Sequence, residues 1–527
     1  YPKLRRLQRI MLARINQSTA NKSVPPVGGS ALERRQLLHS LTPYLSLYLT
    51  RSLSRLNEPV SMMFPEGKRM NTDGDDRLVL PTKTDVLTFS KIVSQEISAA
   101  QLDAELAVAI CKGSCKAMSL FSAKAESLIM MDETATQFRL YQPGMSISTS
   151  TKNANVSAGA AKLAAAAVSA SLRTKAQAHN ITLLDLIVRL YDLTKRIPED
   201  TTDESSNKNV ISISGQDSSV AVIAQKQKAI QPALRNLESL VDLILGDYLA
   251  AAAKALEAVL ARMHRENFSS GDPSSTQYVN ISLDSDVADD REDVIESSAY
   301  MDTFGDAVSV LCREHLDKLP NQHTIVQRLR QRLLCRVIVL FLRNVCMIRP
   351  LDSKGRLRLV RDLTLFEEAI LPLAPSCRQE KTDELANLFE ELRSLRKLLM
   401  INPAYENENA LKSYRELVYT KKTRLSSVLL LIFASAPPEL RSPHDQLRMS
   451  PERFGEWMDK AENGKDPTNI ALLDSGTRRN RSLEDAVCKL VTAELDRYMQ
   501  RVSAKVKSQS TDQLSLASEY HLLRKLV

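Results

Sequence analysis

Long helical patterns that stop at proline-rich phrases set the limits on how this chain can fold. Apolar residues recur at intervals of three and four along roughly 84–131, 155–197 and 219–265, which predicts three helices of about 40 residues each. Helices in ordinary globular domains average about 11–12 residues. Because helices of this length bury their apolar faces best against one another, the pattern predicts an elongated antiparallel bundle.

The composition favours the same fold class. Only 15 of the 527 residues are Gly and 5% are aromatic, whereas helix formers such as Ala, Leu, Lys and Glu are common. The clearest strand-like alternation, Val210–Ile213, lies in a stretch rich in Ser, Asn and Asp that favours a loop. We therefore expect an all-α protein.

An acidic stretch marks the expected domain boundary. Residues 269–296 begin with Ser, Gly and Pro and continue with Asp284, Asp286, Asp289, Asp290, Glu292, Asp293 and Glu296, which is typical of a flexible linker or loop. We expect a long-helix bundle over 1–268 and a bundle of shorter helices over 297–527. Together they predict an elongated rod of consecutive helical bundles.

Charge and cysteine content narrow the class of protein. A net charge of +8 with both signs mixed permits contact with acidic lipid or an acidic partner but does not indicate nucleic acid. Seven widely spaced Cys indicate reduced thiols in the cytosol. The Arg-rich opening does not suggest a signal peptide. The longest uncharged apolar stretch, Leu425–Pro438, is shorter than the roughly 20 residues that a membrane helix needs.

Signatures of catalysis are not found in the sequence. It contains no phosphate-binding Gly-x-x-x-x-Gly-Lys-Ser/Thr loop, no His-Glu-x-x-His and no Gly-x-Ser-x-Gly. Cys111 and Cys115 share a helix face and can offer two thiolates, but a buried apolar role is the alternative because no further ligands lie nearby. We expect no enzyme activity, no cofactor and no bound metal.

A basic region over 321–361 is the strongest electrostatic feature, with a single acid, Asp352. We consider it a possible surface for anionic lipid or for an acidic partner, including the chain's own residues 284–296. The alternative is a solvated face whose arginine stems cover an apolar seam. The candidate residues of this surface are Arg328, Arg332, Arg336, Arg343, Arg356 and Arg358.

Two apolar patterns in the C-terminal half invite a partner as well as a core interpretation. A heptad seam over 385–399 suits a partner helix, or a coiled-coil-like contact inside the molecule's own bundle. Phe454, Trp457 and Met458 follow a helix start at Ser450-Pro451, and we expect a core anchor rather than a partner hot spot. The seam consists of Leu385, Leu388, Leu392, Leu395 and Leu399.

Three phrases place helical patterns against proline-marked corners, as expected for joints of a helical scaffold. The first is Tyr48–Leu56, followed by Glu58-Pro59 and Phe64–Gly67. The second is Ile348–Leu351, followed by Gly355–Leu359 and Asp362. The third is Ala436–Pro443, followed by Ser450–Trp457.

In order and spacing these phrases resemble the C-terminal part of the family of subunit five of the conserved oligomeric Golgi complex, which is similar to the helical-rod proteins of multisubunit vesicle tethers. The resemblance touches most of the chain, from Tyr1–Leu4 through Met263–Phe268 to the Trp457 region. It implies a non-catalytic scaffold in intra-Golgi retrograde transport, peripheral on the cytosolic face of the Golgi membrane. It implies sister subunits as partners, most directly subunit seven, and contacts with small GTPases, golgins and SNAREs.

Other functions stay open on the sequence alone. One is a subunit of another helical tether, such as the exocyst. Another is a helical GTPase regulator, which would need an inserted Arg or Asn finger. A basic scaffold for nucleic acid is the third.

Overall fold

A computed structural model shows how the predicted elements fold. It describes residues 1–19, 33, 36, 39–64, 80–100, 104–138, 140, 173–203, 217–269, 298–374, 383–401, 407–419, 423–463, 481–509 and 516–527. All regular elements in these ranges are helices, so the all-α prediction is confirmed. The first part of the 155–197 pattern, Val210–Ile213 and nearly all of the acidic stretch over 269–296 lie outside the described residues.

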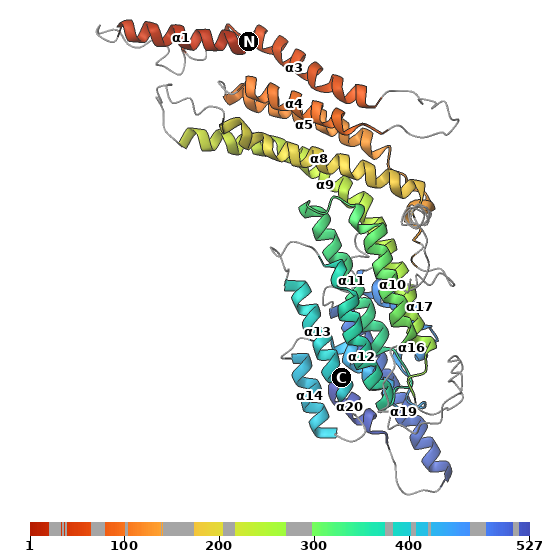
Figure 1. Ribbon diagram of the computed structural model, residues 1–527. Helices are drawn as coiled ribbons and strands as arrows, with labels where there is room; N and C mark the ends of the chain where they lie inside the picture. Colours follow the sequence, from red (N-terminus) through yellow and green to blue (C-terminus); the bar gives the residue numbers. More distant parts are fainter. Residues whose placement is uncertain are drawn as a thin grey trace, which may run out of the picture. The chain divides into compact units, whose positions relative to one another are not determined.

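The chain divides into two compact units (Figure 1). Unit 1 contains residues 1–132 and 175–244, and unit 2 contains residues 133–174 and 245–527. Helix α9, Asp217–Leu260, contributes to both units. The predicted domains 1–268, 269–296 and 297–527 stay a prediction.

Unit 1 is built from helices that pack side by side. Helix α3 packs on α4 and α5, and α4 packs on α8. Fully buried Phe89, Val93 and Phe121 belong to its core. Helix α4 begins with a capping box between Thr82 and Asp85, which satisfies otherwise unpaired backbone donors. The described helices of the unit are α1 (Pro2–Thr19), α3 (Thr42–Met63), α4 (Lys83–Ala99), α5 (Ala104–Glu126), α8 (Lys175–Asp203) and the first part of α9.

Two helix ends predicted from prolines are wrong. Helix α3 continues through Pro59 to Met63, and α8 continues past Pro198 to Asp203. An interior proline costs roughly 3 kcal/mol, but burying one large apolar side chain recovers roughly 1.5–3 kcal/mol. Beyond Pro59, Val60 is fully buried and Met63 is nearly so. Their burial therefore outweighs the lost hydrogen bond in α3.

The predicted long helices were only partly confirmed. The pattern over 84–131 forms two helices, α4 and α5, whereas α9 is a single helix of 44 residues that also passes Pro232. Helices α14 (Asn407–Tyr419) and α15 (Leu425–Ser435) are separated by a similarly short interval. Long periodic patterns do not show where a short break interrupts them.

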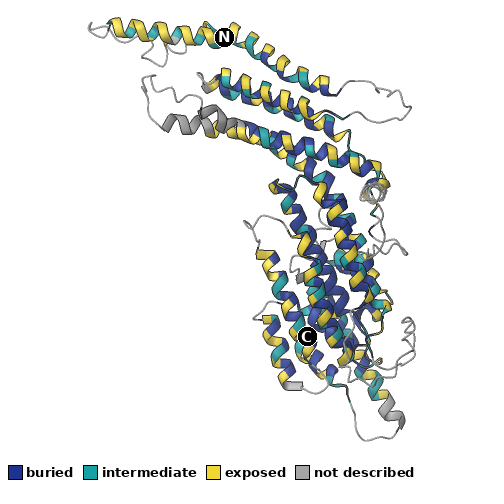
Figure 2. Cartoon of the chain, viewed as in Figure 1, coloured by how far each residue is buried: buried dark blue, intermediate teal, exposed yellow. Residues whose placement is uncertain are grey.

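Unit 2 is organised around α11, Thr324–Cys346, whose side chains are almost all buried (Figure 2). It packs against α13, α15 and the 3₁₀ helix η1 (Ala261–Arg265). Phe341 of α11 stacks on Phe366 with ring centroids 3.8 Å apart, and Phe366 stacks on Phe304. The other described helices are α6 (Glu133–Thr136), α10 (Ala299–Glu314), η3 (Leu316–Lys318), α12 (Ser353–Ala369), η4 (Leu371–Leu373), α13 (Asp383–Met400), α14, α15, α16 (Pro443–Gln446), α17 (Pro451–Asn463), α19 (Arg481–Gln509) and α20 (Ser518–Leu526).

The two ambiguous apolar patterns are internal. All five leucines of the heptad seam are buried in α13, which packs on α11 and α12. Phe454 and Met458 are buried, and Trp457 is half-buried with its ring stacked on Phe454 at 5.1 Å. Both patterns therefore serve unit 2 itself.

One described helix is long and apolar enough to cross a membrane by length and composition alone. It covers Glu105–Glu126, within α5, and half of its apolar window is buried inside the protein. Core helices of soluble proteins pass the same test, so this is weak evidence.

We expect Pro59→Ala to stabilise unit 1 by about 1–3 kcal/mol, because Ala restores the missing helix hydrogen bond and removes the ring clash. The measurement is calorimetric melting of the variant beside wild type. Pro43→Ala is the matched control, because Pro43 lies in the first turn of α3, where proline is tolerated. No gain at Pro59 would mean that α3 ends before it.

Candidate functional site

The second and third of the phrases behind the family resemblance meet in unit 2, together with Met263–Phe268. We call this meeting the proline joint and define it as Met263–Phe268, Ile348–Asp362 and Ala434–Asp445. Leu351 N–H donates to the Ala434 carbonyl at 3.0 Å, and Asp352 N–H donates to the Phe268 carbonyl at 3.3 Å. Segments far apart in the sequence are thus tied backbone to backbone.

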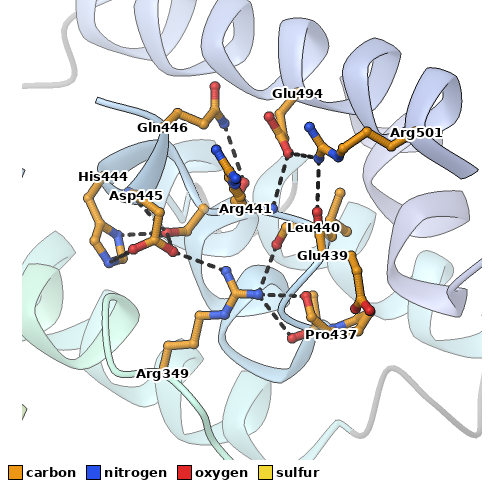
Figure 3. A network of polar contacts seen from close by, with 12 residues as sticks. Arg349, Pro437, Glu439, Leu440, Arg441, His444, Asp445, Gln446, Glu494 and Arg501 are labelled. Carbon is orange, nitrogen blue, oxygen red and sulfur yellow. Dashed lines mark hydrogen bonds and ion pairs between the residues drawn. The ribbon is translucent and has the colours of Figure 1, made fainter. Parts of the chain in front are cut away.

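Arg349 is the centre of the joint (Figure 3). Its Nη2 donates to the carbonyls of Ala436, Pro437 and Leu440 at 3.2, 2.6 and 2.9 Å. The prolines of this turn provide no N–H, and Leu440 N–H reaches only the Pro437 carbonyl among the three, so Arg349 supplies the donor for the other two. The planar guanidinium supplies several donors at once, which a lysine ammonium does less well.

Asp445 supports Arg349 from the other side. Arg349 Nη1 donates to Asp445 Oδ2 at 3.2 Å, and Ser442 Oγ donates to the same oxygen at 2.7 Å. Ser442 also caps α16, whose first helical residue is Pro443. Burial lowers the pKa of Arg349, while Asp445 and Glu494 favour its charged form.

Helix α19 binds the other side of the turn over 436–442 (Figure 3). Glu494 is buried and accepts a hydrogen bond from Arg441 N–H at 3.2 Å. It is also paired with Arg501, which donates to the Glu439 carbonyl at 2.9 Å. The turn over 436–442 is therefore held by two arginines, Arg349 from the connection between α11 and α12 and Arg501 from α19.

The start of α12 closes the joint. Asp352 caps α12 by accepting from Gly355 N–H at 2.7 Å. A Cβ on Gly355 would lie 2.0 Å from the Phe268 carbonyl oxygen, so only glycine fits there. Arg358 pairs with Glu266, donates to the Asn267 carbonyl and lies 5.1 Å from the Phe268 ring.

Buried Asp362 connects α12 to the start of α10. It accepts from Ser298 Oγ at 2.7 Å and from Tyr300 Oη at 2.9 Å. Burial raises the pKa of Asp362, and these hydrogen bonds oppose the rise. Glu266 Oε1 in turn accepts from Tyr300 N–H at 2.9 Å, which joins the start of α10 to the joint.

A cavity of about 260 Å³ lies beside Arg349 and Pro350. His264 and His444 line it, and burial lowers the pKa of both rings, so both are neutral at pH 7. His264 Nε2 is 2.9 Å from Asn344 Oδ1, and His444 Nδ1 is 2.9 Å from Ser442 Oγ. Both histidines thus hold hydrogen bonds within the joint, and the Ser442 hydroxyl beside His444 also caps α16 and donates to Asp445. The hydrogen bonds and ion pairs of the proline joint therefore fix the directions of the helices that meet there.

A second charged cluster lies between α11 and α17. Arg336 Nη1 donates to Asp459 Oδ1 at 2.8 Å, and Arg343 Nη1 donates to the same oxygen at 2.6 Å. Arg343 also pairs with Glu462 at 3.2 Å. Burial alone would raise the pKa of Asp459, but Arg343 and Arg336 lower it to about 2.

The candidate basic surface is largely internal. Arg336 and Arg343 are buried in the cluster with Asp459, and Arg356 is buried with its Nη1 donating to the Ile401 carbonyl at 2.7 Å. The prediction that these three face a partner or lipid is wrong. The acids and carbonyls that pair with them lie far away in sequence, so the sequence pattern could not show the pairing. Arg358 pairs with Glu266 and is mostly buried. Arg328 is exposed and Arg332 is half-buried, so the surface prediction stays open for these two.

A larger cavity of about 470 Å³ adjoins the Asp459 cluster, with alanines of α9 among its lining residues. Glu257 lines it, and burial raises the pKa of this carboxyl. Both signs of charge surround the cavity, which favours no single class of ligand.

Among the residues that the structure describes, no group of His, Cys, Asp and Glu is placed to hold a metal ion. Cys111 is buried, and burial raises the pKa of its thiol to about 11.

Comparison with known proteins adds to this geometry. No family model matches the chain. Subunit 5 of the conserved oligomeric Golgi complex from Mus musculus is 26% identical over 494 residues, 88% of this chain and 49% of the mouse protein. The chain resembles subunit 5 of that complex. This confirms the resemblance carried by the phrases of the proline joint.

Two further relatives agree. Subunit 5 from Arabidopsis thaliana is 22% identical over 87% of this chain and 45% of the plant protein. Subunit 5 from Drosophila melanogaster is 29% identical over 44% of this chain and 27% of the fly protein. The chain spans about half the length of the mouse and plant relatives.

Solved structures are more distantly similar. The C-terminal domain of the exocyst subunit Sec6p is 10% identical, with a TM-score of 0.41 over 94% of this chain and 98% of that chain. The Myo2 globular tail domain in complex with Mmr1 is 14% identical, with a TM-score of 0.35 over 92% of this chain and 97% of that chain. Scores this low support no functional parallel.

The proline joint makes opposite predictions for two glycines. Gly355→Ala should destabilise unit 2 by about 3 kcal/mol, because its Cβ would collide with the Phe268 backbone. Gly305→Ala, in α10, should stabilise by about 1 kcal/mol, because nothing lies within 4 Å of the added Cβ. Urea unfolding followed by circular dichroism measures both. Equal effects would show that α12 does not approach Phe268 this closely.

Asp459→Asn should destabilise unit 2 by about 3 kcal/mol at pH 7, because it leaves two buried arginines without their shared carboxylate. Since the folded pKa of Asp459 is about 2, below the unfolded value of roughly 3.9, the carboxylate stabilises fully above pH 4. That contribution is lost as the pH falls toward 2. The difference between wild type and variant should therefore shrink over this window in thermal melts.

Asp496→Asn is the matched control for Asp459→Asn. Asp496 pairs with Arg524 at 3.1 Å, and both side chains are more than half exposed. Exposed pairs contribute little, about 0–1 kcal/mol. A loss at Asp496 as large as that at Asp459 would contradict the importance assigned to the buried cluster.

Proposed function

We propose that the chain is a non-catalytic scaffold segment of a Golgi vesicle-tethering complex that acts in intra-Golgi retrograde transport. The observation that carries the proposal is the similarity to subunit 5 of the conserved oligomeric Golgi complex along 88% of the chain. The proposal concerns the segment present in this chain, which is about half of such a subunit.

The proline joint supports a scaffold role. Its most elaborate polar contacts, those of Arg349 and Glu494, satisfy backbone groups at a turn between helices. A tether gains avidity when weak binding sites are held at fixed spacing, and rigid joints provide that spacing. An elongated arrangement of consecutive bundles belongs to this proposal.

The partners follow from the same proposal. The segment assembles with sister subunits of the complex, most directly with subunit seven, and contacts small GTPases, golgins and SNAREs. It acts as a peripheral protein on the cytosolic face of the Golgi membrane, in the cytoplasm. Exposed Arg328 and half-buried Arg332 of α11 are the remaining candidates for a partner or lipid surface.

The buried arginines argue against the GTPase-regulator alternative. A catalytic finger must project into a nucleotide site on another protein. Arg336, Arg343 and Arg356 are each buried against groups of this chain, so none of the three projects outward.

Co-expression with subunit seven of the same complex, followed by size-exclusion chromatography with light scattering, tests the proposal. We expect a one-to-one complex that contains both chains. A folded chain that stays monomeric beside subunit seven and the other sister subunits, or that assembles with exocyst subunits instead, would overturn it.

A pair of charge-reversed variants locates the interface in the same experiment. Arg328→Glu with Arg332→Glu should weaken assembly at least tenfold if the α11 face binds the partner. Lys489→Glu with Arg497→Glu is the control, because both residues are exposed on α19. Assembly that survives both double variants would support the function and reject the α11 face.

A further inference from the structure

Most apolar residues of helix α1 are exposed. Leu7 and Met11 are 56% and 62% exposed, and Leu4, Ile10 and Ile15 are also exposed. The spacing of three and four between Leu4, Leu7, Met11 and Ile15 places them on one helical face. Figure 2 shows α1 as an element whose described residues are exposed or intermediate. An ordinary surface helix has the opposite arrangement, with its apolar face against the core.

The less exposed side of α1 is mainly polar. Arg5, Gln8 and Asn16 are half-buried, together with Tyr1, Leu12 and Thr19 at intervals of three and four. Tyr1 anchors this side through its ring, which stacks on Tyr48 of α3 with centroids 6.3 Å apart. The apolar face of α1 is therefore left uncovered by the described residues.

The charge of α1 has one sign. Its sequence contains Lys3, Arg5, Arg6, Arg9 and Arg14 and no Asp or Glu. Lys3 lies four residues before Leu7, and Arg14 lies four residues after Ile10, so both cations border the apolar face. Lys3, Arg6 and Arg14 are exposed. Long basic side chains at the edge of an apolar face can keep their charges at a polar surface while the stems lie on apolar material.

We propose that α1 binds the surface of an anionic lipid bilayer, with Leu4, Leu7, Met11 and Ile15 in the headgroup–acyl boundary and Lys3, Arg6 and Arg14 at the lipid phosphates. An amphipathic helix with basic residues and no acids fits such an interface, where apolar burial and electrostatic attraction add. An acidic protein helix is the less favoured occupant. Protein hot spots are rich in Trp, Tyr and Arg anchors in pockets, whereas this face is a shallow row of aliphatic residues and Met.

This inference goes beyond the proposed function, because a scaffold that is held by sister subunits needs no lipid contact of its own. Its test also needs no sister subunit, so the lipid inference and the proposed function can fail separately.

Tyr44 and Leu47 of α3, each more than half exposed, extend the exposed apolar surface of unit 1.

Vesicle flotation with the full chain is the experiment. We expect binding to vesicles of equal parts phosphatidylcholine and phosphatidylserine, little binding to phosphatidylcholine alone, and weaker binding as salt rises. Met11→Asp should lower the partition coefficient about tenfold, because it replaces an apolar side chain by a charge that the lipid phosphates repel. Arg6→Glu with Arg14→Glu should lower it at least tenfold.

Matched variants keep the result specific to α1. Met62→Asp alters a methionine on α3 that is 71% exposed and should leave binding within twofold of wild type. Arg497→Glu alters an exposed arginine of α19 and should do the same. Equal loss from Met62→Asp or from Arg497→Glu would overturn the assignment to α1. Failure of the wild-type chain to float with anionic vesicles would overturn the lipid proposal itself and leave the face to a protein partner.

Discussion

The helices around the proline joint depend on one arginine that supplies what proline lacks. The turn over 436–440 contains two adjacent prolines, Pro437 and Pro438, so it has fewer backbone donors than acceptors. Arg349 compensates with one nitrogen that reaches three carbonyls. Because an unpaired buried carbonyl costs about 1–3 kcal/mol, this contact decides whether the turn can be packed at all. The direction in which the chain leaves α15 follows from it.

Buried ion pairs in unit 2 also hold separate segments of the chain together. Arg336 and Arg343 are buried beside Asp459, and Glu494 is buried beside Arg501. Buried ion pairs often add little net stability over an apolar core, yet breaking one is costly. Their value in this protein is directional: the Asp459 cluster ties α11 to α17, and Glu494 with Arg501 ties α19 to the turn over 436–442. A helical scaffold with few aromatic residues gains from such directional contacts.

Unit 1 contrasts with unit 2 in what it leaves exposed. The buried arginines of α11 hide positive charge inside unit 2, whereas α1 of unit 1 displays both positive charge and apolar side chains. The first arrangement specifies a fold, and the second suits contact with another surface. Net charge alone does not distinguish these uses, because arginines in both places contribute equally to the total.

Periodicity was enough to predict the all-α class, the seam of α13 and the buried stripe of α9, because those signals lie within one helix. It failed at Pro59 and Pro198, where side chains beyond the proline decide whether the helix continues. Of the candidate surface residues, the sequence could show only that Arg328–Arg358 is a basic run. Whether each arginine faces water or a carboxylate depended on Asp459, Glu266 and the carbonyls near 400, which lie tens of residues or more away.

The sequence by itself determined the helical class, the proline-marked corners and the similarity to a tethering subunit. These are local properties of spacing and residue type, and a linear pattern records them completely. Only the tertiary structure decided that Met263–Phe268, Ile348–Asp362 and Ala434–Asp445 form one joint and that the basic run is mostly internal. The physical reason is that hydrogen bonds and ion pairs are made between groups close in space, and folding brings together groups whose separation along the chain has no periodic signature.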